Sequence, residues 1–405
     1  MFKVFFGNVN IGGSETLILR ILKKILYKGI GVKLYCNKIN ENALNLFESN
    51  DVEVCVIGSG FYGSFLKELN DSDTLMVFGI QSFMACNNYI RKKNINCQFF
   101  LYIVHPYTTI LFRNKQILNI VFGKEYRKIV QRGINNGIIA FMDEQCLNYA
   151  IKHMNLEISP DIQKECIIRL LLDNIANADF ETIEKKAENR KDSFEILSVA
   201  RADFPFKGYM RGLINQFSEL KVRYPNIKLN IVSARDDVYI LKSWIEEKAA
   251  KGVHDITLHL NVPYDELKKH YKKAHLYVGM GTTILEAASY GTISIAVAPY
   301  TYECNADCYF HQKPNWVLTE IGEGNDIKPL IEKIILLEDN EYKIMGNKTI
   351  EVFNDTYNSE KIVAQIINFN SNKNTIDLGF VLSLYTLLYM GLFNLKVFLR
   401  RLICR

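Results

Sequence analysis

The chain carries one pattern twice: short apolar runs that fit β-strands alternate with amphipathic stretches that fit helices. At its start, the apolar run 2–7 is followed at 14–29 by apolar residues at helical spacing. Strands separated by helices of this length imply parallel β-α-β crossovers and helices on both faces of a sheet. We therefore predict an α/β chain with two doubly wound domains. The other expected strands are 31–36, 51–57, 73–79, 97–104 and 137–142 in the first half, and 193–200, 227–233, 255–260, 275–280 and 292–298 in the second.

The length supports the same division, because 405 residues exceed what one hydrophobic core usually serves. The polar stretch 181–192 is the best linker candidate. Helical patterns follow at 326–338, 340–353 and 359–369. The predicted parts are a first domain at 1–185, a second at 186–356, a crossover helix back to the first at 357–371, and a tail at 372–405.

Composition excludes several classes of protein. Hydrophobic residues make up 48% and charged residues 23%, which rules out global disorder. The net charge of +5 is mild, and the basic residues form no stripe interleaved with aromatics, so nucleic acid is a disfavoured partner. Nine scattered cysteines, several inside apolar runs, indicate reduced, buried thiols in a cytosolic protein. The first residues form a strand pattern, so we expect no secretory signal.

Ligands of doubly wound sheets bind beyond the carboxyl ends of the strands. Gly12-Gly13-Ser14-Glu15 lies at such a place, after the first strand and at the start of a helix. Glycines allow a ligand close to the backbone, and free amides at a helix start favour an anion. The alternative is an ordinary tight turn in which Ser14 caps the helix.

Two cations follow the first strand of the second half. Arg201 and Lys207, the latter followed by Gly208, lie between that strand and the next helix. Such a pair could hold a diphosphate and neutralise the charge that builds as it leaves. The alternative is a solvated basic loop.

A glycine-rich turn leads from strand to helix at 279–291. Its expected donor-binding residues are Gly279, Gly281, Thr282 and Thr283, because amides at a helix start bind phosphate. Glu286 lies about one helical turn further on, where a carboxylate can accept two sugar hydroxyls. The alternative is an ordinary strand-turn-helix with an exposed glutamate.

Two further sets of residues allow a functional and a structural interpretation. His105 ends an apolar strand and could contact a transferred sugar, although a locally satisfied histidine fits the sequence too. Cys304, Cys308 and His311 could be drawn as a metal site, but three ligands without a second pair favour a structural loop.

Together these motifs resemble the GT-B glycosyltransferases, and within them family 4, over about residues 1–370. That family has a Gly-Gly-small-Glu loop after its first strand and a histidine late in its first domain. Its second domain opens with an arginine and a Lys-Gly pair, and later carries two glutamates separated by seven residues. The resemblance implies two Rossmann-like domains with an interdomain cleft. It also implies transfer of a sugar from a nucleotide-diphosphate donor with retention of the anomeric configuration.

The resemblance gives the candidate residues their roles. The diphosphate would be held by Gly12, Gly13, Arg201, Lys207 and amides near Gly281, while Glu286 would bind the ribose and His105 the sugar. No metal or other cofactor is implied, because cations and a helix dipole supply positive charge to a UDP- or GDP-linked donor. We nominate no side-chain general base.

The sequence departs from the family at one position, since the first motif glutamate falls on Val278. This leaves open an unusual donor sugar or a weak or lost activity. The competing functions are a catalytically weak GT-B partner subunit and another nucleotide-sugar enzyme, such as an epimerase.

The end of the chain suggests a membrane. Residues 378–395 carry no charge, and as a helix they would span ~27 Å, close to the thickness of a bilayer core. Three arrangements are open: insertion without crossing, a full span, or docking on the first domain. A full span would conflict with the positive-inside rule, because basic residues follow the segment. These residues are Lys396, Arg400, Arg401 and Arg405.

A second basic and apolar stretch, at 111–133, fits either a surface for anionic lipid or a domain helix with a solvated face. Its basic residues are Arg113, Lys115, Lys124, Arg127, Lys128 and Arg132. We therefore expect a cytoplasmic protein, peripheral or monotopic at the inner face of the cell membrane. Such a position suits a lipid-linked or glycan acceptor, as in assembly of capsule or O-antigen.

Overall fold

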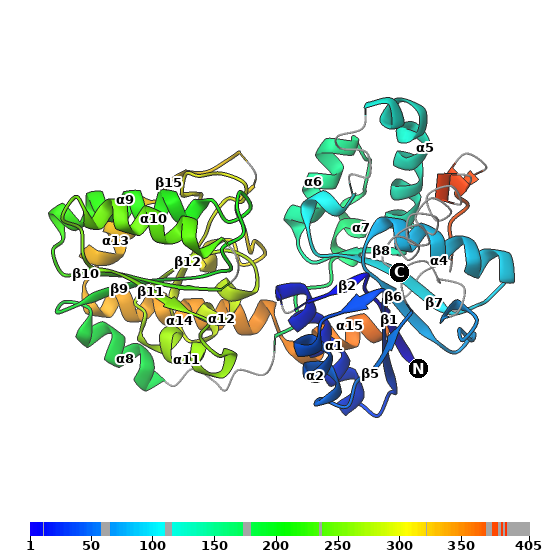
Figure 1. The fold of residues 1–405 in the computed structure, drawn as a ribbon, viewed down its shortest axis with the longest axis horizontal. Helices are drawn as coiled ribbons and strands as arrows, with labels where there is room; N and C mark the ends of the chain where they lie inside the picture. Colours follow the sequence, from blue (N-terminus) through cyan, green and yellow to red (C-terminus); the bar gives the residue numbers. More distant parts are fainter. Residues whose placement is uncertain are drawn as a thin grey trace, which may run out of the picture. The chain divides into compact units, whose positions relative to one another are not determined.

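The chain folds into two compact units, Met1–Leu171 with the segment from Ser359 onward, and Leu172–Asn358 (Figure 1). The division falls earlier than the expected boundary at 185. The computed structural model describes residues 1–10, 12–57, 65–109, 116–172, 180–234, 237–320, 322–369, 375–379, 382–383 and 385–386.

The first unit contains a six-stranded parallel sheet in the order β5-β3-β1-β6-β7-β8. The central strand β1 is buried at every position, as expected for a parallel sheet covered on both faces. All six strands lie within the predicted apolar runs. Their bounds are β1 (Phe2–Phe5), β3 (Val32–Cys36), β5 (Glu53–Val56), β6 (Thr74–Val77), β7 (Gln98–Ile103) and β8 (Ile139–Phe141).

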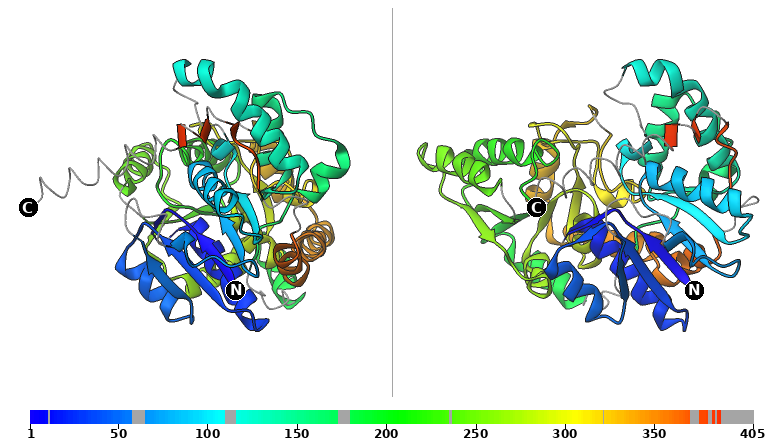
Figure 2. Two further views of the ribbon diagram at one scale, coloured as in Figure 1. Left: turned by 90° about the vertical axis from the view of Figure 1, so that its right-hand side faces the viewer. Right: turned by 45° about the vertical axis from the view of Figure 1, so that its right-hand side comes forward.

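Helices cover both faces of this sheet (Figures 1 and 2). Helices α1 (Gly13–Tyr27) and α2 (Glu41–Glu48) lie on one face, while α4 (Ile80–Lys93) and α5 (Gln116–Asn135) lie on the other. Helix α15 (Ser359–Ile367) packs on α1, where Lys28 and Glu360 form an ion pair of 2.7 Å. The remaining elements are the short strands β2 (Asn8–Val9) and β4 (Lys38–Ile39), the 3-10 turn η1 (Pro106–Thr109), and helices α6 (Glu144–Met154) and α7 (Pro160–Glu165).

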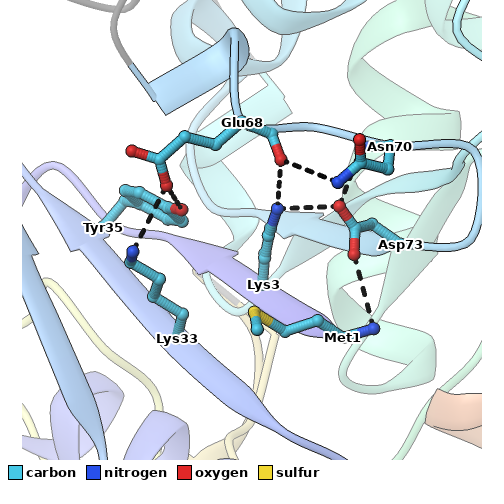
Figure 3. Close-up of polar contacts among 7 residues, drawn as sticks. All are labelled: Met1, Lys3, Lys33, Tyr35, Glu68, Asn70 and Asp73. Atoms are coloured by element: carbon cyan, nitrogen blue, oxygen red, sulfur yellow. Dashed lines mark hydrogen bonds and ion pairs between the residues drawn. The ribbon is translucent and has the colours of Figure 1, made fainter.

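At the amino-terminal end of this sheet, the charge of a buried lysine is balanced by a carboxylate (Figure 3). Lys3 donates to the Asp73 carboxylate at 2.7 Å and to the Glu68 carbonyl at 2.6 Å. Burial alone would raise the pKa of Asp73, but hydrogen bonds from Lys3 and the Asn70 amide lower it. Glu68 also accepts from the Tyr35 hydroxyl at 2.6 Å. This network stabilises the edge opposite the one where ligands of such sheets bind.

The second unit contains a five-stranded parallel sheet in the order β11-β10-β9-β12-β13. Its strands also lie within the predicted runs: β9 (Phe194–Val199), β10 (Ile227–Ser233), β11 (Ile256–Leu260), β12 (Leu276–Gly279) and β13 (Ile293–Ala296). One face carries α9 (Tyr209–Arg223), α10 (Val238–Ala249) and α13 (Lys328–Leu336). The other carries α8 (Phe180–Asn189), α11 (Tyr264–Lys273), α12 (Thr282–Ser289) and α14 (Asp339–Thr356). Short elements β14 (Asn305–Ala306), η2 (Phe310–Gln312) and β15 (Asn325–Asp326) complete the unit.

The stretch 181–192, expected as a linker, is mostly helix α8 of the second unit. Lys186 is buried and donates to the Tyr271 carbonyl at 3.0 Å and to the Thr292 hydroxyl at 2.6 Å. The helix also packs against α14. Its polar residues form the solvent side of a docked helix, and composition alone did not distinguish this from a linker.

The described beginning of the apolar tail packs on the first unit. Ile376 exchanges two backbone hydrogen bonds of 2.8 Å with the Asn87 side chain, and Arg91 pairs with Asp377 at 2.6 Å. Leu382 is buried, and the Tyr385 ring lies 5.2 Å from that of Phe122 in α5. These contacts favour the docked arrangement for the start of 378–395. The rest of that segment and the four basic residues after it lie outside the described residues. Within the described part, no helix is long and apolar enough to cross a bilayer.

Candidate functional site

The strand order of the second unit marks where a ligand would bind. From β9 the chain builds outward through β10 and β11, then returns to place β12 on the other side of β9. Doubly wound sheets bind ligands beyond the carboxyl ends of strands at such a reversal. The Tyr277 hydroxyl joins the two sides here, 3.2 Å from the Val199 carbonyl and 2.6 Å from Thr283 Oγ1. The residues that follow β9 and β12 therefore lie at one edge.

Arg201 and Lys207 stand at this edge, in the segment between β9 and α9. Both side chains are half-buried. Desolvation, with a smaller contribution from the nearby Arg201 charge, lowers the pKa of Lys207 to about 7. The Lys207 ammonium lies 4.6 Å from the centre of the Phe206 ring. Two cations held close together with little water favour a multiply charged anion between them.

The backbone around these cations is closely packed. A Cβ atom at Gly208 would come within 2.6 Å of the Thr301 carbonyl oxygen, so the start of α9 requires glycine. The Tyr300 amide donates to the Phe206 carbonyl at 3.2 Å. The Lys-Gly pair is thus explained by packing as well as by charge.

The two glycines in the turn from β12 to α12 are required for different reasons. Gly281 has a φ of 74°, which favours glycine, and its amide donates to the Val317 carbonyl at 2.7 Å. This amide already donates its hydrogen bond within the fold. It therefore does not supply the hydrogen bond to a phosphate that we expected. Gly279 leaves room for Tyr277, whose hydroxyl oxygen would lie 2.3 Å from a Cβ atom there. The amides of Thr282 and Thr283 are the first of α12, where a helix offers no acceptor of its own.

Val278, the position of the missing family glutamate, lies within β12 and is fully buried. It is paired with Ile295 of β13. Its apolar side chain supplies no hydrogen-bonding group to a donor sugar.

Glu286 of α12 is 5% exposed and accepts hydrogen bonds from two tyrosines of α11. Tyr271 donates to Oε2 at 2.9 Å, and Tyr264 donates to Oε1 at 3.2 Å. Glu286 is therefore buried, and the exposed glutamate of the structural alternative is wrong. Neither tyrosine was predicted from the sequence, although their spacing of seven residues places them on one side of a helix.

The first-unit candidates lie at the carboxyl edge of their own sheet. Gly12 is extended and Gly13 begins α1. Glu15 is buried, and its Oε1 accepts from the Asn10 amide at 3.2 Å, which fixes the loop before the helix. Ser14 makes no capping hydrogen bond here, because the helix cap is Gly12. The alternative in which Ser14 caps the helix is therefore wrong.

His105 follows β7 and is half-buried. Its Nδ1 accepts from the Tyr107 amide at 3.1 Å, so the neutral ring carries its proton on Nε2. A ring oriented in this way can donate from Nε2 to a sugar hydroxyl. The contact at Nδ1 equally suits the structural interpretation of this residue.

Among the residues that the structure describes, no three His, Cys, Asp or Glu side chains are grouped to hold a metal ion. Cys304 is buried, and desolvation raises the pKa of its thiol well above the usual range. His311 stacks on Tyr309 with ring centres 5.7 Å apart. The eight cysteines of the described part are all free thiols.

Comparison by sequence finds one family match, and it lies within the second unit. Residues 179–352 match the family described as Glycosyl transferases group 1. No curated protein sequence matches the chain significantly.

Solved structures share the fold of nearly the whole chain. A glycosyltransferase from Rickettsia africae ESF-5 has a TM-score of 0.63 at 14% identity, covering 90% of this chain and 96% of its own. HepE from Anabaena, solved with UDP and glucose, has a TM-score of 0.62 at 13% identity, covering 90% and 98%. WaaG, a glycosyltransferase involved in lipopolysaccharide biosynthesis, has a TM-score of 0.57 at 12% identity, covering 91% and 100%. This likeness shows the fold predicted for a GT-B glycosyltransferase, and the family match over the second unit supports the same assignment. Transferase activity and membership of family 4 stay predictions.

Proposed function

We propose that this chain is a GT-B glycosyltransferase, which transfers a sugar from a UDP- or GDP-linked donor to a lipid-linked or glycan acceptor in bacterial surface polysaccharide synthesis. The observation that carries the proposal is the edge of the second sheet. There Arg201 and Lys207 follow β9, the free amides of α12 follow β12, and the two sides are joined through Tyr277. HepE was solved with UDP and glucose, which supports a nucleotide in a fold of this kind.

The residues have complementary tasks in the proposed reaction. The bond between the anomeric carbon and the diphosphate oxygen breaks, and a bond from the acceptor hydroxyl oxygen forms on the same face. The proton of that hydroxyl passes to the departing diphosphate oxygen. Negative charge builds on the departing diphosphate, where Arg201, protonated Lys207 and the first amides of α12 stabilise it. Glu286 accepts the ribose hydroxyls. Positive charge from the protein makes a metal ion unnecessary.

Nucleoside diphosphates are expected to raise the melting temperature of the protein, because a ligand that binds only the folded state stabilises it. UDP and GDP should be compared by differential scanning fluorimetry. Affinity should be roughly tenfold weaker at about pH 8.5 than at about pH 6.5, since Lys207 must take up a proton to meet the diphosphate once the pH exceeds its pKa of about 7. Absence of any shift with either nucleotide would contradict the proposed donor class.

A partner subunit without turnover is the second candidate, and Val278 favours it. A buried valine cannot accept hydrogen bonds from the donor sugar as the family glutamate does. Incubation with a panel of nucleotide sugars separates the two functions, because an active transferase releases nucleoside diphosphate by transfer or slow hydrolysis and a scaffold releases none.

We infer a membrane-binding surface on helix α5 of the first unit, which would suit a lipid-linked acceptor. Helix α5 exposes Ile120 (82%) and Val121 (56%). Four exposed basic residues follow on the same helix: Lys124, Arg127, Lys128 and Arg132. Arg113 and Lys115 lie outside the described residues. Exposed apolar side chains next to basic ones are typical of a surface that binds anionic lipid.

Vesicles containing phosphatidylglycerol should therefore bind the protein, and those of phosphatidylcholine alone should not. Lys124→Glu with Arg127→Glu should reduce binding in a sedimentation assay by at least about fivefold. Lys228→Glu with Lys242→Glu, which changes two exposed lysines of the second unit, is the matched control. Equal loss in both double variants would indicate an effect of net charge and not of this surface.

A further inference from the structure

The two tyrosines that donate to Glu286 differ in their surroundings. Tyr271 is 2% exposed, with its ring centre 6.0 Å from that of Tyr277 and 6.2 Å from that of Tyr290. Tyr264 is 55% exposed and begins α11 directly after Pro263. Packing holds the first hydroxyl in place, whereas the second tyrosine is more than half exposed.

The Glu286 carboxylate needs donors whether or not a ligand is bound. It is 5% exposed, and a buried carboxylate without hydrogen bonds is strongly destabilising. Tyr271 supplies Oε2 from inside the unit at 2.9 Å. Desolvation and the Glu286 charge raise the pKa of Tyr271, so this hydroxyl keeps its proton. Tyr264 supplies Oε1 from the exposed side at 3.2 Å, the side from which a ligand must arrive.

We infer that Tyr264 occupies, in the ligand-free protein, the hydrogen-bonding position on Glu286 that a ribose hydroxyl takes in the complex. The inference rests on the proposed nucleotide function. One O–H donor replaces another, so Oε1 is never left unsatisfied. Because only a ligand that brings a hydroxyl to this point can replace Tyr264, the tyrosine makes binding selective for ribose. It also lowers the affinity, because its own hydrogen bond must first be broken.

Tyr264→Phe tests the inference, because it removes the competing hydroxyl and leaves Glu286 and the ring. The variant should bind UDP about three- to tenfold more tightly than the parent by titration calorimetry. Its melting temperature without nucleotide should be lower, and with saturating UDP it should equal that of the parent. This combination identifies a hydrogen bond that exists only in the ligand-free state. Tyr239→Phe, which alters another exposed tyrosine of the same unit, should change neither quantity.

The possible results separate this inference from the function beneath it. A parent that binds UDP or GDP, with a Tyr264→Phe variant that binds equally or more weakly, overturns the role of Tyr264 and leaves the nucleotide site intact. A folded parent that binds neither nucleotide overturns the proposed function and this inference with it.

Discussion

Arg201→Met is expected to lower the kcat of sugar transfer by about a hundred- to a thousandfold, the usual effect of removing one fixed group that stabilises developing charge. Lys207 cannot compensate, because its pKa of about 7 leaves part of it neutral at physiological pH. The kcat of Arg201→Lys should lie between those of the parent and the methionine variant, since a lysine keeps the charge but cannot form bidentate hydrogen bonds. Release of nucleoside diphosphate from the accepted donor measures the effect.

The matched control for this prediction is Arg211→Met, which changes an exposed arginine of α9. It should keep the kcat of the parent. Full activity in Arg201→Met would show that Arg201 does not stabilise the leaving diphosphate, and the role given to this edge of the sheet would be wrong.

Glu286→Ala is expected to weaken UDP binding by about a hundredfold, because two hydrogen bonds from ribose hydroxyls to a carboxylate are lost together. The variant should also unfold more readily, by about 1–3 kcal/mol, since the buried Tyr271 hydroxyl loses its acceptor. Calorimetry measures the first effect and denaturant unfolding the second. Glu286→Gln keeps an oxygen acceptor, so it should lose less of both.

Glu246→Ala, at an exposed position of α10, is the control for a general effect of removing a carboxylate. The ribose assignment fails if UDP and GDP bind Glu286→Ala as tightly as the parent. A loss of stability without a loss of affinity would make Glu286 a structural partner of the two tyrosines.

The strands, and the strand ends at which the candidate site lies, could be predicted because their sequence patterns are local. A buried parallel strand is an unbroken apolar run, and β1 and β9 are buried at every position. The cations after β9 and the turn after β12 could be placed at strand ends from the positions of these apolar runs alone. The contacts of Glu286 could not, because they depend on how α11 packs against α12, which neither helix encodes by itself.

Features that depend on long-range packing were predicted wrongly or incompletely. The polar run at 181–192 has the composition of a linker, yet Lys186 finds three acceptors at residues more than eighty positions away. The start of the apolar tail has the composition of a membrane segment, yet Asn87 and Arg91 bind it from nearly three hundred positions earlier. Gly279 and Gly281 fit a phosphate-binding turn, and the structure shows that contact with Tyr277 requires Gly279 and that a φ of 74° favours Gly281.

The return of α15 to the first unit has a consequence for how the protein is made. Residues that precede and follow the second unit in the sequence together form the first unit, so all of 172–358 leaves the ribosome before α15 does. The second unit can finish folding while its neighbour still waits for α15 to cover α1. A single cut in the gene therefore cannot yield the first unit intact, and its isolation calls for excising the middle and joining the flanks.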